Sequence, residues 1–275
     1  MNGSPWIVAH NSVSDPRLRL FCFPYAGGGA SVYRKWPSSL PADVQLLAAQ
    51  LPGREARFVE PPLRDIQSVL GHLVAAIEPI LDRPFVFFGH SLGALIAYEL
   101  AKLLRSLGLR MPEHLFLSGR RAPSIPIGRR SFHDLPDDEL IQEIRALSGT
   151  SEGVLENGEL MKLVLPTLRA DFAIHDTYRY REEAALDVPF SIFGGLDDIA
   201  TSRENLFAWQ TMTNRGAQLI LFQGGHFFID EARDEVLAAV ERTLASDEIS
   251  RASRFRCLRD GHVATQSQFR SVPAR

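Results

Sequence analysis

The chain has 275 residues, of which 45% are apolar and 23% are charged, an ordinary composition for a soluble globular protein. Its length suffices for one large domain with a full hydrophobic core or for two small domains. The formal net charge of −3 gives no sign of a nucleic-acid-binding protein.

Cys22 and Cys257 lie far apart in the sequence. They form neither a disulfide framework nor the spacing of a metal site, and we interpret both as reduced thiols of a cytoplasmic protein. The N-terminal residues lack a basic segment followed by an apolar run, so we expect no secretory signal. No apolar run is long enough to span a bilayer, and no membrane association is expected.

Apolar runs of strand length alternate with amphipathic segments of helix length. The runs are almost continuously hydrophobic, which is typical of a parallel sheet covered by helices on both faces. The expected strands are 18–23, 44–51, 84–89, 114–119, 188–195 and 217–225. The expected helices between them are 66–81, 92–107, 203–214 and 230–245. This alternation predicts a doubly wound, mostly parallel α/β fold, in which residues 1–246 form a single domain.

The alternation is interrupted once, because no strand is expected from about 120 to 185. Segment 131–149 has an acidic first turn, and its apolar positions on one helix face are Leu140, Ile141, Ile144 and Leu147. Segment 158–178 continues as helix, where Pro166 forces a kink or a new start. Such an insertion usually lies over the edge of the sheet where α/β proteins bind ligands, so we interpret it as a lid. The alternative is a packing element away from the site.

The end of the chain, residues 247–275, shows no sustained hydrophobic period, and residues 251–275 carry six arginines against one aspartate. We expect a basic, poorly ordered C-terminal tail, with a basic docking arm as the alternative.

The sequence Gly89-His90-Ser91-Leu92-Gly93 matches G-x-S-x-G, the nucleophile-elbow pattern. It follows an expected buried strand and opens an expected helix, which is the setting that the elbow requires. Glycines are needed there because the serine backbone is strained and the strand and helix approach closely. The alternative is a plain strand-to-helix turn. The pattern predicts Ser91 as a nucleophile above a helix N-terminus that favours negative charge.

A serine hydroxyl needs a general base, because it is a weak nucleophile at neutral pH. His226 follows the last expected strand and precedes the last expected helix, so its loop faces the same sheet edge as the elbow. Histidine at this place follows the chain order serine, acid, histidine of this fold. We therefore predict His226 as the base and expect His90 to pack beside the serine.

The base needs an acid that fixes its tautomer and stabilises the imidazolium. Asp197 and Asp198 follow the strand that ends near Gly194, on a loop at the same sheet edge. One of the pair is expected to orient the base and the other to cap the following helix. The residues alone leave the choice between the two open.

The developing oxyanion needs two backbone donors. One is the N–H of Leu92, directly after the nucleophile, and the other comes from the loop after an early strand. The glycine-rich segment FPYAGGGASVY supplies that loop, and the N–H groups near Ala26 and Gly27 are the candidates. A nucleotide-phosphate loop is disfavoured, because neither G-x-x-x-x-G-K-[ST] nor G-x-G-x-x-G is present.

Several motifs together resemble those of free-standing type II thioesterases, which accompany nonribosomal peptide synthetases and polyketide synthases. GHSLG alone is typical of α/β hydrolases in general, whereas its combination with PYAGG, LPGRE and GGHFF is far more specific. The similarity runs from about residue 18 to residue 244. The motifs are FPYAGGGASVYRKW, LPGRE, GHSLGALIAYELA, LPDDEL, LRADF, FGGLDD and GGHFF.

The resemblance implies an α/β-hydrolase fold whose mobile lid is the insertion. It further implies an enzyme that hydrolyses acyl thioesters on the phosphopantetheine arm of acyl or peptidyl carrier proteins and so clears misprimed or stalled chains. Neither a metal nor an organic cofactor is required, because the pantetheine belongs to the substrate, and a monomer is expected. The alternatives are a medium-chain fatty acyl-carrier-protein thioesterase, a small-molecule serine esterase or lipase, and a non-catalytic binding module.

Position by position, the resemblance implies Ser91 as nucleophile, His226 as base, and Ala26 and Leu92 as the oxyanion donors. In the G-x-x-D element of the family the acid stands three residues after the second glycine. That residue here is Asp198, so the resemblance resolves the choice that the residues left open.

Carrier proteins of these systems are typically acidic, as the resemblance implies, so a basic rim near the site mouth would assist docking. The candidate rim residues are Arg54, Arg57, Arg64, Arg120, Arg121, Arg129 and Arg130. The alternative is an ordinary solvated surface, and for Arg54 a structural ion pair with Glu55 is favoured over substrate contact. Phe172 and Tyr178 are the expected lid side chains that close the acyl pocket.

Overall fold

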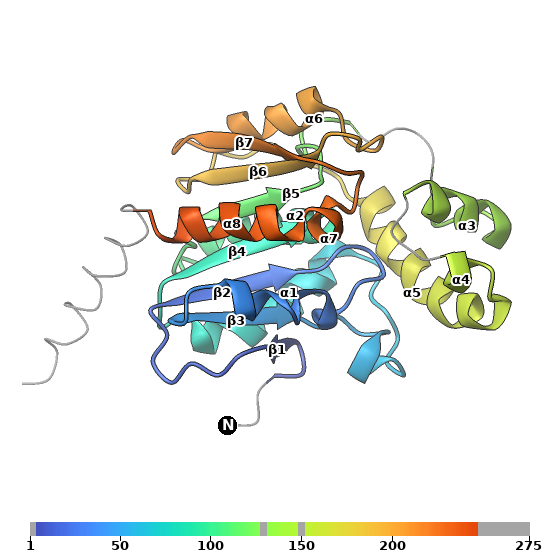
Figure 1. The fold of residues 1–275 in the computed structure, drawn as a ribbon, viewed down its shortest axis with the longest axis horizontal. Coiled ribbons are helices and arrows are strands. Elements are labelled where there is room, and N and C mark those ends of the chain that lie inside the picture. The colour runs from blue at the N-terminus through green and yellow to red at the C-terminus, as the bar shows by residue number, and fades with distance from the viewer. Residues whose placement is uncertain (1–3, 127–130, 148–151, 247–275) are drawn as a thin grey trace, which may run out of the picture.

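A computed structural model describes residues 4–126, 131–147 and 152–246 of the chain. Its strands form one sheet in the order β1-β3-β2-β4-β5-β6-β7 (Figure 1). Strand β1 pairs antiparallel with β3, and all other neighbours are parallel. The strands are β1 Ile7–Ala9, β2 Leu18–Phe23, β3 Val44–Ala49, β4 Phe85–His90, β5 Leu115–Ser118, β6 Phe190–Gly195 and β7 Ala217–Phe222.

Every strand that the apolar runs predict is present, with ends that differ by at most three residues. The additional strand, β1, escaped detection because three residues are too few to show a period and its side chains are half-buried or exposed. The predicted tail 247–275, together with Arg129 and Arg130, lies outside the described residues.

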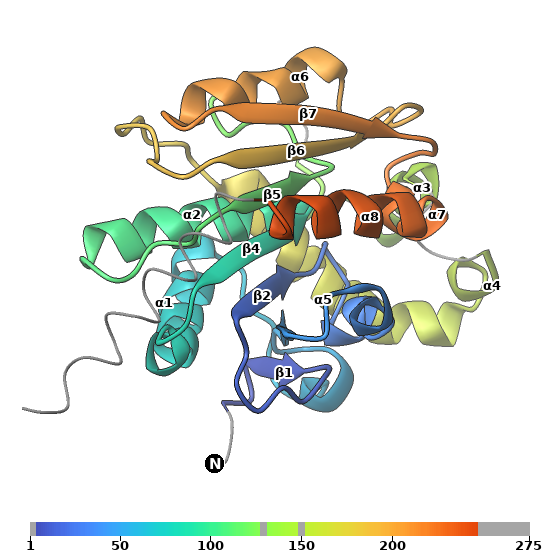
Figure 2. The same ribbon diagram turned by 60° about the vertical axis from the view of Figure 1, so that its left-hand side comes forward.

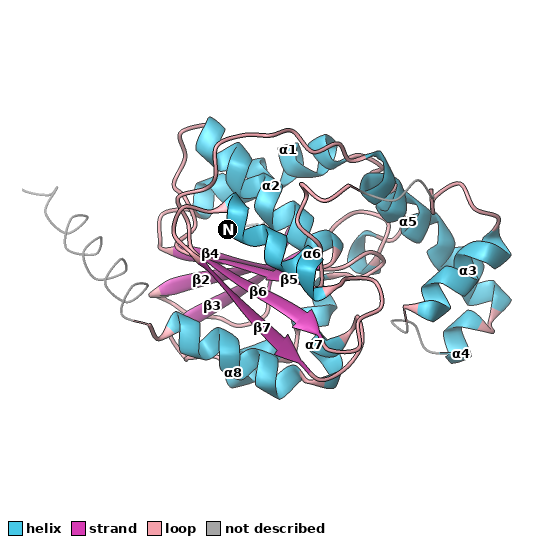
Figure 3. Ribbon diagram, turned by 90° about the horizontal axis from the view of Figure 1, so that it is seen from above, coloured by secondary structure: helices cyan, strands magenta, loops and turns pink. Residues whose placement is uncertain are grey.

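Helices cover both faces of the sheet, as Figure 3 shows from above. The helices of one face are α1 (Ile66–Ile77), α2 (Leu92–Ser106) and α6 (Arg203–Phe207), whereas α8 (Arg233–Leu244) covers the other face. Alternate residues of β4 serve the two cores, since Phe85 and Phe87 pack on the first face and Val86 and Phe88 on the second. The doubly wound architecture is therefore confirmed.

Three predicted helices are interrupted. Helix α1 passes directly into a 3₁₀ helix, Glu78–Ile80. Helix α6 passes directly into a 3₁₀ helix, Ala208–Met212, and the last predicted helix is divided into α7 (Phe228–Glu231) and α8. Helix α6 is capped by Ser202, whose hydroxyl accepts the N–H of Asn205 at 3.3 Å. The expectation that an aspartate of the preceding loop caps this helix is therefore wrong.

The insertion between β5 and β6 is helical, as the sequence predicts. It contains α3 (Asp137–Ala146), α4 (Glu152–Leu155) and α5 (Gly158–Thr177), which share a small core of their own. Figures 1 and 2 place α3 and α4 beyond the end of the sheet toward which the parallel strands point. Pro166 lies inside α5, so the helix continues through it and no new start forms.

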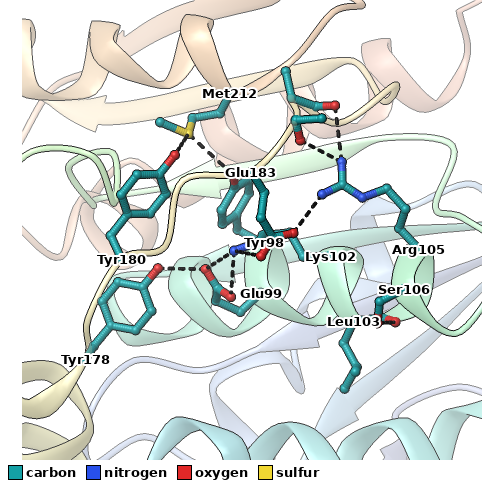
Figure 4. Close-up of polar contacts among 12 residues, drawn as sticks. Tyr98, Glu99, Lys102, Leu103, Arg105, Ser106, Tyr178, Tyr180, Glu183 and Met212 are labelled. Atoms are coloured by element: carbon teal, nitrogen blue, oxygen red, sulfur yellow. Dashed lines mark hydrogen bonds and ion pairs between the residues drawn. The ribbon is translucent and has the colours of Figure 1, made fainter.

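The end of the insertion is fixed to α2 by a cluster of polar contacts, drawn in Figure 4. The hydroxyl of Tyr178 donates to Oε1 of Glu99 at 2.6 Å, and Lys102 forms ion pairs with Glu99 at 3.2 Å and Glu183 at 3.0 Å. Arg105 also pairs with Glu183 at 3.0 Å. Because Glu99, Lys102 and Tyr178 are buried, the contacts of Glu99 with the other two are shielded from water and hold the chain after α5 on α2. Among the described residues, no helix has the length and apolar character that a bilayer crossing requires.

Candidate active site

The turn from β4 into α2 holds Ser91 in a strained conformation, with φ +53° and ψ −110°. This turn is tight enough to exclude side chains at both flanking glycines. A Cβ on Gly89 would overlap the carbonyl of Gly93, and a Cβ on Gly93 would overlap the carbonyl of Phe23. The two glycines therefore permit the close approach that presents Ser91 at the start of α2, as predicted.

Three residues from separate loops meet at this turn. Nε2 of His226 lies 3.1 Å from Oγ of Ser91, and Nδ1 of His226 lies 2.9 Å from Oδ2 of Asp198. His226 follows β7 and Asp198 follows β6, so the parallel strands deliver all three side chains to one edge of the sheet. Both His226 and Asp198 are buried, which strengthens the interaction between them.

The two adjacent aspartates, Asp197 and Asp198, differ in burial. The side chain of Asp198 is 1% exposed, and its second oxygen accepts the N–H of Ala200 at 2.8 Å. Asp197 is exposed to solvent. Only Asp198 is therefore placed to orient His226.

The two expected oxyanion donors also lie at the site. Among the hydrogen bonds of the described residues, none uses the backbone N–H of Ala26 or Leu92. Leu92 is the first residue of α2, so its N–H has no acceptor within the helix. The N–H of Gly27, by contrast, donates to Oδ2 of Asp171 at 2.7 Å and is not available to a substrate. Of the two candidates in the glycine loop, Ala26 retains its donor.

Asp171 is the site residue that the sequence reasoning missed. It lies on α5, is 1% exposed, and accepts two hydrogen bonds from Arg54, at 2.6 Å and 2.9 Å. Arg54 also donates to the carbonyl of Gly28 at 3.2 Å, so one buried ion pair joins α5 to the loop that carries Ala26. An aspartate three residues after Leu168, on the apolar face of α5, was the signal for such a buried partner.

The favoured ion pair between Arg54 and Glu55 is wrong, because Arg54 pairs with Asp171. Glu55 instead accepts the hydroxyl of Ser31 at 2.5 Å. Its backbone has a φ of +48°, which is unusual for a residue other than glycine.

His90 is fully buried beside the serine, as expected. Its Nδ1 lies 2.9 Å from Oγ of Ser118, and its ring lies 5.3 Å from that of His226. Burial, together with the proximity of His226, holds the pKa of His90 well below its usual value. The ring is therefore neutral at pH 7 and serves packing, not proton transfer.

Two cavities meet at Ser91. The first, of about 440 Å³, runs along the glycine loop and is called here the glycine-loop cavity. The second, of about 310 Å³, is lined by Arg120 and Arg121 and is called the arginine cavity. Both are lined by Phe172, which is thus a pocket residue as expected. Tyr178, which follows α5, lines neither cavity and contacts Glu99 of α2 instead.

Three of the seven candidate residues of the basic rim are buried, and the docking role of the others stays a prediction. Arg54, Arg57 and Arg120 are buried, and the first two are engaged in ion pairs with Asp171 and Glu60. Arg64 is exposed. In the described part of the chain, no group of histidine, cysteine and acidic side chains could hold a metal ion.

A doubly wound sheet, a strained serine between strand and helix, and a histidine and an acid from the following loops define the α/β-hydrolase fold. The family profile of the thioesterase domain matches residues 18–244. The chain belongs to the thioesterase family and is a hydrolase that acts on thioesters.

Curated relatives support this assignment. The chain is 42% identical over 232 residues to the gramicidin S biosynthesis protein GrsT of Aneurinibacillus migulanus, covering 84% of this chain and 91% of that protein.

Solved structures agree. RedJ, a thioesterase from the prodiginine pathway of Streptomyces coelicolor, matches with a TM-score of 0.79 and 36% identity, covering 82% of this chain and 90% of RedJ. BorB, a type II thioesterase from the borrelidin cluster, matches with a TM-score of 0.81 and 35% identity, covering 89% of this chain and 99% of BorB. The resemblance to type II thioesterases is thereby confirmed.

Proposed function

We propose that the protein removes acyl groups from the phosphopantetheine arm of carrier proteins through a covalent acyl-serine intermediate. The observation that carries the proposal is the hydrogen-bonded series Ser91, His226 and Asp198 at a cavity in a thioesterase-family chain. The carrier-bound substrate is supported by similarity to RedJ and BorB, thioesterases of the prodiginine and borrelidin biosynthetic systems.

In the first step, Nε2 of His226 accepts the proton of Ser91 as Oγ attacks the thioester carbonyl. The carbonyl oxygen becomes an oxyanion, which accepts hydrogen bonds from the N–H groups of Ala26 and Leu92. Asp198 accepts the Nδ1–H of His226 and stabilises the imidazolium. Collapse of the tetrahedral intermediate breaks the carbon–sulfur bond, and the proton on His226 passes to the departing pantetheine thiol.

In the second step, water replaces the thiol. His226 accepts a proton from this water as its oxygen attacks the acyl-serine carbonyl, and the same donors stabilise the second oxyanion. The carbon–oxygen bond to Ser91 breaks, the proton returns to Oγ, and the free acid leaves. The net reaction consumes one thioester and one water and releases one acid and one thiol.

We infer that the biological role of this hydrolysis is to clear misprimed or stalled chains from a nonribosomal peptide or polyketide synthetic system. Such an editing enzyme must accept several acyl groups, which suits a site made of two cavities that meet at the nucleophile. The insertion α3–α5 is proposed as its lid.

The test is hydrolysis of a carrier protein loaded with a short acyl group. We expect release by the wild-type protein and a loss of at least about a thousandfold in Ser91→Ala. Matched oxygen esters and medium-chain acyl carriers serve as alternative substrates. Cleavage of simple oxygen esters without release from the carrier would contradict the proposal in favour of a small-molecule esterase, and a strict preference for medium chains would favour a fatty-acyl thioesterase.

A further inference from the structure

Arg120 is a buried cation without a carboxylate partner among the described residues. It follows β5 and is 7% exposed. One long hydrogen bond, 3.4 Å from its Nη1 to Nδ1 of His175, engages the guanidinium. Some buried side-chain nitrogens and oxygens of the described residues lack a hydrogen-bond partner, but none of them belongs to Arg120. The guanidinium nitrogens of Arg120 that have no partner are therefore accessible from open space. That space is the arginine cavity.

The neighbouring groups do not neutralise this charge. Arg121 lines the same cavity, also without an ion pair to any described residue. The carboxylate of Asp171 is held by Arg54, and Glu143, which also lines the cavity, is not among the groups that shift the pKa of Arg120 or Arg121. Burial and the two arginines lower the pKa of His175 to about 3, so this ring is neutral at pH 7 and adds no negative charge.

Arg120 keeps its own charge. Burial, with the adjacent charge of Arg121, lowers its pKa to about 10, which leaves the guanidinium protonated at neutral pH. A buried charge without a partner is costly, and five donors in a rigid fork are suited to oxygen acceptors. A cation that faces a cavity beside the nucleophile therefore indicates a polar ligand, not a structural role.

The position of Arg120 indicates which part of the substrate it meets. The carbonyl of Ser118, two residues before Arg120, accepts the backbone N–H of Ser91 at 2.8 Å. Ser91, His226 and Ala26 line the same cavity. The pantetheine phosphate is separated from the thioester by a long chain with two amides. A group close to the reacting carbonyl, within the acyl chain, matches the location better.

We propose that Arg120 and Arg121 form an acyl-binding subsite for groups that carry a hydrogen-bond-accepting oxygen, above all a terminal carboxylate. The same subsite disfavours acyl groups that carry an ammonium, because it would place like charges together. This inference rests on the proposed function, since it assigns the acyl group of the same thioester substrate.

The test compares three N-acetylcysteamine thioesters, which lack the phosphate: succinyl, butyryl and 4-aminobutyryl. The kcat/KM of the wild-type protein is expected to be highest for succinyl and lowest for 4-aminobutyryl. In Arg120→Met the ratio of succinyl to butyryl kcat/KM should fall by about tenfold or more, as for a lost charge-assisted hydrogen bond. Arg121→Met, at a half-buried position, should lower the same ratio. Arg34→Met, at an exposed position, is the matched control and should leave it unchanged.

An unchanged ratio in both Arg120→Met and Arg121→Met would overturn the subsite. The two substitutions could also change only the ratio of kcat/KM for butyryl-phosphopantetheine to that for butyryl-pantetheine. This result would overturn the subsite as well, because the arginines would then bind the phosphate. The failure of the proposed function looks different: the wild-type protein would cleave none of these thioesters, or Ser91→Ala would cleave them equally well.

Discussion

At the scale of single residues, the two adjacent aspartates provide the sharpest comparison. We expect Asp198→Asn to lower kcat/KM by about a thousandfold or more, because the amide would favour the wrong tautomer of His226. Asp197→Asn, at the exposed neighbouring position, should retain activity close to that of the wild-type protein. Steady-state hydrolysis of one acyl thioester by the two variants is the measurement. Equal losses in both would mean that Asp198 does not orient the base.

The sequence predicted Ser91 and His226 because each carries a local signature, glycines that flank a serine and a histidine directly after a strand. It did not separate Asp197 from Asp198 without the family resemblance. The two differ in burial and in their partners, which depend on how the loop after β6 folds against His226. A local pattern contains no such information.

At the scale of elements, α5 supports the glycine loop, which carries the proposed oxyanion donor Ala26, through Asp171. We expect Asp171→Asn to reduce kcat by about ten- to a hundredfold with a smaller change in KM, because Ala26 would lose its fixed position. Affinity for a trifluoromethyl ketone, which forms an oxyanion, should fall in parallel with kcat. If the role of Asp171 is purely structural, Asp171→Asn should lower the melting temperature without a parallel fall in kcat and in affinity for the ketone.

Asp176 provides the control on the same helix. It accepts the N–H groups of Phe132 at 2.7 Å and His133 at 3.0 Å, within the insertion and away from the glycine loop. Asp176→Asn should therefore preserve the affinity for the ketone. If it lowers this affinity as much as Asp171→Asn, the effect belongs to helix stability and not to the oxyanion loop.

The contact of α5 with the glycine loop could not be predicted from the sequence. Asp171 and Arg54 are 117 residues apart, and the motif LPGRE suggested the nearer partner Glu55. The contact also bears on the lid. Because Asp171 and Thr167 anchor α5 to loops of the main fold, we expect any opening of the proposed lid to involve α3, α4 and the first turns of α5.

At the scale of the whole molecule, buried histidines make stability depend on pH. Burial lowers the pKa of His114 to about 3, so the folded protein keeps this ring neutral. The unfolded chain binds a proton there below its ordinary pKa of about 6.5. Stability is thus lost as pH falls below that value, by about 2 kcal/mol at pH 5 for such a residue.

The measurement is the free energy of unfolding in urea at pH 7 and pH 5. His114→Gln should reduce the loss between these pH values by about 2 kcal/mol relative to the wild-type protein. Its partner, Oγ of Ser191 at 2.9 Å, can hydrogen-bond to the amide, so the variant remains a fair comparison. An identical loss in both proteins would show that His114 is not kept neutral by the fold.

The overall architecture was predictable because buried parallel strands are continuous apolar runs, whatever lies around them. The layering of two cores follows from the alternation along each strand, as in β4. The short edge strand β1 and the break between α7 and α8 were not predictable, because each depends on tertiary contacts rather than on a local period.

The central claim is that Ser91 becomes covalently acylated during turnover. Rapid acid quenching of the protein with an acyl-loaded carrier, followed by mass spectrometry of the peptide that contains Ser91, tests this most directly. We expect the mass of the acyl group on Ser91 in the first turnovers, and its absence in Ser91→Ala. Hydrolysis by the wild-type protein with no acyl group on Ser91, or acylation at another residue, would contradict the claim.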